Sequence, residues 1–202
     1  MANNPLNSII RVTDDQVVHE NKDFGFTIHS CKIEDPSVQL LITNGLRNHK
    51  QEVNKENEKY QHIELYVCLP DYWNLSKHPW PLHWLNRIAQ VPQKNNTWFG
   101  AGDTIPAGNP PSEVSPKFSA NHFILSPPIF LSELLSGPSW KNADFQLLSV
   151  IPIYQKELDF KLKNSHTMLF NKFDLYRISE KIDTYRNSAC PSVFKRLLKP
   201  RR

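Results

Sequence analysis

The chain has 202 residues, of which 39% are hydrophobic and 11% aromatic, and it carries 24 Lys and Arg against 20 Asp and Glu. This length suits one domain, and the apolar content excludes an intrinsically disordered chain, which cannot bury enough apolar surface to fold. The longest apolar runs, such as Val150 to Ile153, are far shorter than the roughly 18 residues that a membrane-spanning helix needs. Residues 1–6 have neither a basic start nor an apolar run, so the sequence predicts no secretion signal and a cytoplasmic location.

The net charge of +4 comes from the carboxyl end of the chain. Without the basic residues that follow Tyr185, the rest of the chain has a charge of about −2. These residues are Arg186, Lys195, Arg196, Lys199, Arg201 and Arg202. A basic tail can contact phosphates, but only Phe194 interleaves an aromatic ring with it. We therefore expect a solvated terminus, with nucleic-acid binding as the alternative.

Cysteine and histidine spacing predicts neither disulfides nor a metal site. Cys31, Cys68 and Cys190 form no Cys-x-x-Cys pair, and we expect reduced thiols. The first two lie in apolar, strand-like surroundings, where a cysteine acts as a small hydrophobe. The eight histidines show no His-x-x-x-His or Glu-x-x-His spacing. The short run 100–102 resembles the start of a dinucleotide fingerprint but lacks its third glycine and following helix, so we do not expect a dinucleotide-binding loop there.

The amino-terminal half of the chain predicts strands followed by a helix. Residues 1–23 are polar, and we expect a loosely attached lead-in. Apolar residues then alternate or cluster in three segments that predict strands, namely Phe24 to Ile28, Val38 to Ile42 and His62 to Leu69. A turn is predicted at residues 43–45, and an exposed connection over residues 47–59. The helix predicted between Pro81 and Pro92 has an apolar stripe at spacings of three and four residues.

The carboxyl-terminal half begins with a loop rich in Pro and Gly, which predicts irregular structure with a brief strand at His122 to Leu125. The nearly continuous apolar run from Phe145 to Tyr154 predicts a central strand covered on both faces. Two helical segments follow, Glu157 to Leu162 and Thr167 to Phe173, and we expect Glu157 to pair with Lys161. Beyond Asp174 the spacing fits a helix or a short extended segment.

Two constellations of side chains could carry a function. Tryptophans 73, 80, 84 and 98 crowd together with Tyr72 and Phe99. Such rings either pack the loop on the helix, or some of them (Trp73, Trp80 or Trp98) anchor a partner at the surface. A hydrolase site could instead use His83, Asp103 and His122 as base, orienting group and acid, although nothing in their spacing brings them together.

Several segments together resemble the suppressor-of-fused domain family. The most specific are the loop Asn96-Thr97-Trp98-Phe99-Gly100-Ala101-Gly102-Asp103-Thr104-Ile105-Pro106 and the stretch Gln146-Leu147-Leu148-Ser149-Val150-Ile151-Pro152-Ile153-Tyr154-Gln155-Lys156-Glu157-Leu158. The others are Leu41-Ile42-Thr43-Asn44-Gly45-Leu46, Ile63-Glu64-Leu65-Tyr66-Val67-Cys68-Leu69-Pro70 with Tyr72-Trp73, and the helix Trp80 to Ala89. The resemblance spans roughly residues 37–186, in order and with compatible gaps.

The resemblance implies an α+β domain with a mixed, largely antiparallel sheet, no catalytic residues and no cofactor. In animals the family member is a cytoplasmic inhibitor that grips a peptide of a hedgehog-pathway transcription factor between this domain and a second one. The present length leaves no room for a second domain, so the resemblance carries over no peptide-binding residue. Stand-alone versions resemble bacterial immunity proteins, which neutralise toxins by binding them.

We therefore expect a single domain at residues 24–186, between the lead-in of residues 1–23 and a basic tail of residues 187–202. The expected function is non-enzymatic binding of a protein, as a cytosolic immunity protein against a polymorphic toxin. The expected contact residues are Trp73, Trp80, Trp98, Phe99 and Asp103, unless these form a folding signature of the family. The alternatives are a regulatory scaffold of the suppressor-of-fused type and the hydrolase. No metal, small-molecule substrate or membrane partner is expected.

Overall fold

The structure is a computed structural model that describes residues 4–8, 10–136 and 143–191. Of the basic residues predicted to be solvated at the carboxyl end, those beyond Pro191 lie outside these ranges, whereas Arg186 lies within them and binds the buried Glu157. The chain divides into two compact units, each of which is described by itself. Unit 1 comprises Met1–Asp103, Leu125–Ile151 and Glu180–Ile182, and unit 2 comprises Thr104–Ile124, Pro152–Ser179 and Asp183–Arg202.

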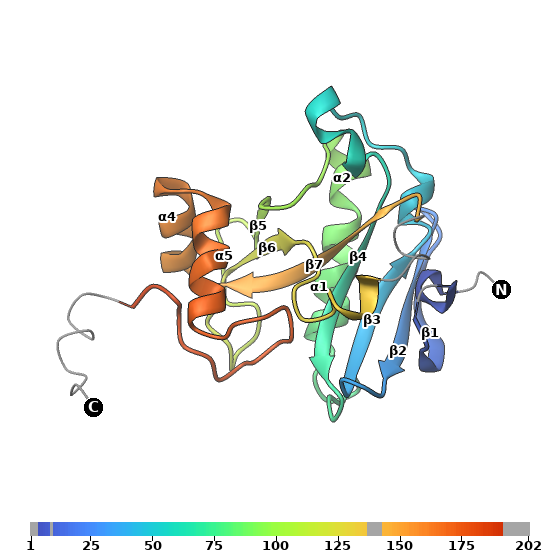
Figure 1. Cartoon of the computed structure of the whole chain (residues 1–202), viewed down its shortest axis with the longest axis horizontal. Helices are drawn as coiled ribbons and strands as arrows, with labels where there is room; N and C mark the ends of the chain where they lie inside the picture. The colour runs from blue at the N-terminus through green and yellow to red at the C-terminus, as the bar shows by residue number, and fades with distance from the viewer. Residues whose placement is uncertain (1–3, 9, 137–142, 192–202) are drawn as a thin grey trace. The chain divides into compact units, whose positions relative to one another are not determined.

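The strands form one seven-stranded sheet with the order β1-β2-β3-β4-β7-β6-β5 (Figure 1). Their bounds are Thr13–Asn21, Phe26–Ile33, Val38–Asn44, Ile63–Pro70, Thr104–Pro106, His122–Ser126 and Gln146–Ile153, for β1 to β7 in chain order. Strand β7 pairs in parallel with β4, whereas β1 with β2, β2 with β3, β3 with β4 and β5 with β6 pair antiparallel. The predicted α+β fold with a mixed, largely antiparallel sheet is confirmed.

Strand β1 was not predicted, because its residues are mostly polar and exposed. It forms the edge of the sheet beside β2, with two irregularities in its register. The second half of the expected loose lead-in is therefore a paired strand. An edge strand with charged side chains and bulges gives little periodic signal, and it resists pairing with other chains.

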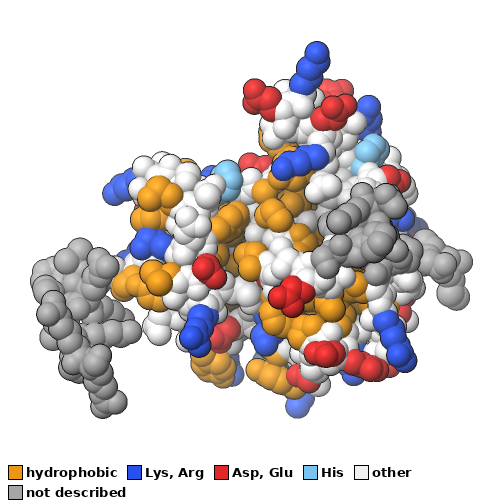
Figure 2. Space-filling view, viewed as in Figure 1, with side chains coloured by type: hydrophobic (Ala, Val, Ile, Leu, Met, Phe, Trp, Pro, Cys, Tyr) orange, Lys and Arg blue, Asp and Glu red, His pale blue; other side chains and the backbone are white. Residues whose placement is uncertain are grey.

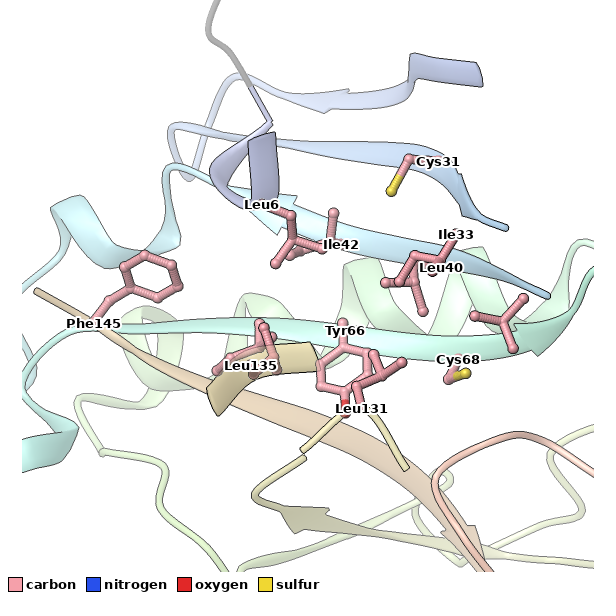
Figure 3. Packing of buried hydrophobic residues seen from close by; sticks show 12 residues of the cluster. Leu6, Cys31, Ile33, Leu40, Ile42, Tyr66, Cys68, Leu131, Leu135 and Phe145 are labelled. Carbon is pink, nitrogen blue, oxygen red and sulfur yellow. The ribbon is translucent and has the colours of Figure 1, made fainter. Parts of the chain in front are cut away.

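Both faces of the central strands are buried in unit 1. Every residue from Ile63 to Leu69 of β4 is buried, whereas the sequence suggested one buried and one exposed face. Helix α1 (Trp80–Ala89) packs across β3 and β4 on one side. On the other side an apolar cluster surrounds Tyr66, with Leu6 from the amino end and Leu131 and Leu135 from the segment before β7 (Figure 3). This apolar layer was not predicted, because its residues come from distant parts of the chain.

The remaining helices of unit 1 are short. Helix α1 begins with Pro81 in its first turn, as predicted, but Pro92 does not end the helical region. Pro92 lies instead in the first turn of a second helix, α2 (Val91–Asn95). A backbone N–H at that position would have no partner within the helix, so proline is tolerated there. The described residues of this unit also form the 3₁₀ helices η1 (Pro5–Ser8), η2 (Leu46–Asn48), η3 (Lys55–Tyr60) and η4 (Leu134–Ser136).

A buried carboxylate holds the turn after β3. Gly45 adopts a φ of +109°, which favours glycine, and this confirms the predicted turn. The Gly45 amide donates to the carboxylate of Glu64 at 2.9 Å, and the hydroxyl of Thr43 donates to it as well. Burial of Glu64 raises the pKa of its carboxyl to about 7, against the opposing effect of these donors and of Arg47.

A second buried carboxylate fixes the segment before η4. Glu180 accepts hydrogen bonds from three consecutive backbone amides, those of residues 129–131, at 2.7 to 3.1 Å. The hydroxyl of Tyr66 donates to the same carboxylate at 3.1 Å. Residues 176–191, the described part of the segment that the sequence left open between helix and extended segment, form neither a named helix nor a named strand, and Lys181 makes a bridge to Cys68.

Unit 2 contains the two helices α4 (Gln155–Lys163) and α5 (His166–Leu175), both of which were predicted. The break between them is confirmed, because the side chain of Ser165 caps α5 by accepting from the amide of Met168 at 3.1 Å. The predicted pair of Glu157 with Lys161 is wrong. Glu157 is fully buried and binds Arg186, whose Nη1 and Nη2 donate to its two oxygens at 2.7 and 2.9 Å.

Candidate functional site

The loop between β4 and α1, residues 71–79, lies at one end of strand β4 (Figure 1). It contains Tyr72 and Trp73, and Trp80 follows it at the start of α1. Tyr72 is 83% exposed, the largest exposed fraction among the hydrophobic side chains described in this unit. Trp73 and Trp80 are half-buried. Their rings meet edge to face, with centroids 5.8 Å apart. We call Tyr72, Trp73 and Trp80 the aromatic loop cluster.

Hydrogen bonds within the loop fix the position of this cluster. The indole Nε1 of Trp73 donates to the carbonyl of His78 at 3.0 Å. The side-chain oxygen of Asn74 accepts from the amide of Lys77 at 3.0 Å. The backbone carbonyl of Asn74 accepts from the amide of His78 at 2.9 Å. A loop ordered in this way loses little conformational entropy when a partner binds, and this favours affinity.

Acidic side chains lie beside the aromatic loop cluster. The hydroxyl of Ser37 donates to Asp71 at 2.8 Å, and this bond joins the β4–α1 loop to the turn between β2 and β3. That turn carries the exposed side chains of Glu34 and Asp35. Figure 2 shows acidic and hydrophobic side chains close together over this lower end of the strands. The surface thus combines apolar contact area with negative charge.

The other predicted contact residues, Trp98, Phe99 and Asp103, lie in a second loop and contact their own fold. The side chain of Phe99 is only 4% exposed and packs inside unit 1. Trp98 stacks on Tyr60 with ring centroids 6.4 Å apart. A Cβ at Gly100 would come within 2.8 Å of the Trp98 ring, so this close packing requires glycine.

Asp103 and a buried glutamine shape the same loop. The side chain of Asp103 accepts from the amide of Gly100 at 2.8 Å, which closes the loop over three residues. The amide group of Gln51 both donates to the carbonyl and accepts from the N–H of Phe99, at 3.1 and 2.9 Å. The sequence analysis missed Gln51, because it lies in a segment whose polar composition predicted exposure. Within this loop the contacts support the alternative interpretation, a folding signature.

The three residues of the alternative hydrolase site lie on different elements. His83 is exposed on α1, Asp103 lies in the second loop, and His122 is buried at the start of β6. The imidazole Nδ1 of His122 lies 2.9 Å from the amide oxygen of its neighbour Asn121, and burial lowers the pKa of this histidine.

The cysteines of the described residues are free thiols. Cys31 and Cys68 are buried as predicted, and burial raises the pKa of the Cys31 thiol to about 11 and that of Cys68 further. Among the residues that the structure covers, no group of three or more His, Cys, Asp or Glu side chains is arranged to hold a metal ion. No helix in these ranges is both long and apolar enough to cross a membrane.

Comparison with known sequences identifies the family. The sequence model of the family described as Suppressor of fused protein (SUFU) matches residues 23–187, which is most of the chain. The chain belongs to the suppressor of fused family. The SUFU resemblance inferred from the two loops and from the segment around β7 is therefore confirmed. No curated protein sequence matches the chain.

Solved structures share the SUFU fold at low sequence identity. A SUFU homolog from Neisseria gonorrhoeae is 15% identical with a TM-score of 0.60, and the match covers 91% of this chain and 90% of that one. A Sufu–Fu complex contains a chain that is 12% identical with a TM-score of 0.59, covering 92% and 88%. Suppressor of Fused from Drosophila is 13% identical with a TM-score of 0.53, and this chain spans 44% of its length.

Proposed function

We propose that this SUFU-family chain acts by binding another protein, as an immunity protein that neutralises a toxin through direct contact. The observation that carries the proposal is the family match over residues 23–187. A structural relative, the Sufu–Fu complex, is itself a protein assembly. In this proposal the chain performs no catalysis and needs no cofactor.

The aromatic loop cluster is the proposed contact surface. Large aromatic side chains that are partly exposed and held in place supply much of the binding energy at protein interfaces. Tyr72 would contact the partner directly, while Trp73 and Trp80 would contribute the neighbouring apolar surface. Trp98, Phe99 and Asp103 are left out of the proposed contact, since their side chains hold the second loop.

The charge of unit 1 supports a basic partner. Its described residues carry 15 Asp and Glu against 11 Lys and Arg, so the small negative charge of the body is concentrated in this unit. Toxins that cleave nucleic acids are basic where they bind phosphates. An acidic surface around Glu34, Asp35 and Asp71 would speed association with such a face by electrostatic steering.

The test is coexpression with the product of the adjacent gene, followed by size-exclusion chromatography with light scattering. We expect a stoichiometric complex, and Tyr72→Ala should weaken it at least about 30-fold, as loss of ~2 kcal/mol at a hot spot implies. Tyr185→Ala is the matched control, because Tyr185 is 93% exposed in unit 2 and outside the proposed surface. Separate elution of the two wild-type proteins at micromolar concentration would refute the proposal.

A further inference from the structure

Unit 2 exposes large apolar side chains that its own packing does not use. Leu162 of α4 is 67% exposed, Met168 and Leu175 of α5 are 49% and 75% exposed, and Tyr176, directly after α5, is 44% exposed. Four of the eight large hydrophobic side chains that the described residues expose thus fall within 15 residues of sequence. Such a concentration is typical of an interaction surface.

The arrangement on α5 forms a stripe. Met168 and Leu175 are seven residues apart, and at about 100° per residue they lie on the same face two turns apart. The buried face of α5 uses Leu169 and Phe173, which point to a different side. The exposed stripe is therefore additional to the side that folds the helix. A spacing of seven residues is the repeat by which one helix packs along another.

The charges around this stripe are mainly positive. From Gln155 to Arg177 the basic residues are Lys156, Lys161, Lys163, Lys172 and Arg177, and the acidic ones are Glu157, Asp159 and Asp174. Glu157 is buried against Arg186 and adds no charge to the surface. The ammonium of Lys172 lies 4.8 Å from the ring centroid of Phe160, so it joins α5 to α4 between the two apolar residues of the stripe. Figure 2 shows basic side chains among hydrophobic ones over α4 and α5.

This charge decides between possible occupants. A second copy that placed its own α4–α5 surface on this one would bring like charges together, which is unfavourable. Residues 192–202 of this chain carry five basic residues and no acidic one, so their charge also disfavours them as the cover. An occupant of opposite charge is left. It would place Asp or Glu side chains against Lys163, Lys172 and Arg177.

We propose that the exposed stripe of α4 and α5 binds an amphipathic helix of another protein, with an apolar face and acidic flanks. Met168 and Leu175 form the seam, Leu162 and Tyr176 border it, and the basic residues pair with the acidic flanks. Helix recognition of this kind reads residues at seven-residue spacing. The inference rests on the proposed class of function, protein binding, but uses different residues from the aromatic loop cluster.

The test is site-specific photo-cross-linking of the full chain in its native host, with p-benzoylphenylalanine at position 175. The control position is Thr167, which is exposed on the same helix but about 100° around it from Met168. We expect one covalent adduct at position 175, a yield at least tenfold lower at position 167, and an acidic amphipathic segment in the adduct by mass spectrometry. The double charge reversal Lys163→Glu and Arg177→Glu should lower the yield at position 175 to the control level.

Absence of an adduct at position 175, an equal yield at both positions, or an adduct with another copy of this chain would overturn the inference. The same cross-linker at position 72 separates this result from the function proposed above. An adduct at position 175 alone supports the stripe and contradicts the aromatic loop cluster. An adduct at position 72 alone does the opposite, and adducts at neither position contradict both. Circular dichroism of each variant checks that the helices remain folded.

Discussion

Replacing Arg186 by alanine should strongly destabilise unit 2. The Glu157 carboxylate is fully buried, and it accepts two bonds from Arg186 and one each from the amides of Tyr154 and Ala189. The guanidinium also lies 4.8 Å from the ring centroid of Tyr154 and donates to the carbonyl of Pro152 at 2.7 Å. Removing one partner of such a pair leaves a buried charge unmatched and costs about 3 to 5 kcal/mol.

Urea unfolding measures this cost. With a slope of ~2 kcal/mol per molar, a loss of 4 kcal/mol lowers the midpoint by about 2 M. The signal should be far-UV circular dichroism, because α4 and α5 belong to unit 2. Tryptophan fluorescence reports unit 1, which holds Trp73, Trp80, Trp84 and Trp98. Recording both signals shows whether the two units unfold together.

Two control variants make the prediction specific. Arg186→Lys keeps the charge but loses the two-pronged geometry, and should cost about 1.5 to 3 kcal/mol. The double variant Glu157→Gln with Arg186→Met removes both charges and should recover much of the loss. A cost below about 1 kcal/mol for Arg186→Ala would refute the reasoning, because it would mean that solvent reaches Glu157.

Three further changes test the fold of unit 1. Because burial raises the pKa of Glu64 to about 7, its protonated carboxyl favours folding, and this stabilisation is lost as the pH rises. Between pH 4.5 and 7 the free energy of unfolding of the wild type should therefore fall by about 3 kcal/mol more than that of Glu64→Gln, measured by urea unfolding. The same pH dependence in both proteins would contradict this. Gly45→Ala should lower the melting temperature more than Gly25→Ala. Both glycines have a positive φ, but only a Cβ at Gly45 would lie 2.7 Å from a backbone oxygen. Equal melting temperatures of the two variants would argue against this clash. Gln51→Ala should lower the free energy of unfolding by about 3 kcal/mol and speed hydrogen exchange at the amide of Phe99, which loses its acceptor. Unchanged protection of that amide would contradict the role of Gln51.

The sequence predicts the elements whose periodicity reflects a simple environment. Helix α1 and strand β7 were found because one has a clear apolar stripe and the other an unbroken apolar run. Strand β1 was missed because its stability comes from pairing with β2 rather than from an apolar face. The sequence also did not show that Glu64 is buried, because a glutamate within an alternating strand ordinarily marks the exposed face.

The candidate site was only partly predictable for a similar reason. Composition singled out the tryptophans, but it could not separate Trp73 and Trp80, beside the exposed Tyr72, from Trp98, which packs on Tyr60. The pairing of Glu157 with Arg186 joins residues 29 positions apart, and the local spacing favoured Lys161 instead. Contacts of this length depend on the folded chain and leave no local pattern. The sequence shows which residues of α5 are apolar, but it does not show which of them are exposed.

The most direct test of the central claim, that this chain acts by covering another protein, is titration of the purified chain into an activity assay of the proposed partner, a toxin expected from the adjacent gene. The account predicts that inhibition is complete at one equivalent, that it is weakened by Tyr72→Ala, and that Tyr185→Ala leaves it unchanged. Full toxin activity in a large excess of the folded wild-type chain, or consumption of a small substrate by the chain alone, would contradict the account.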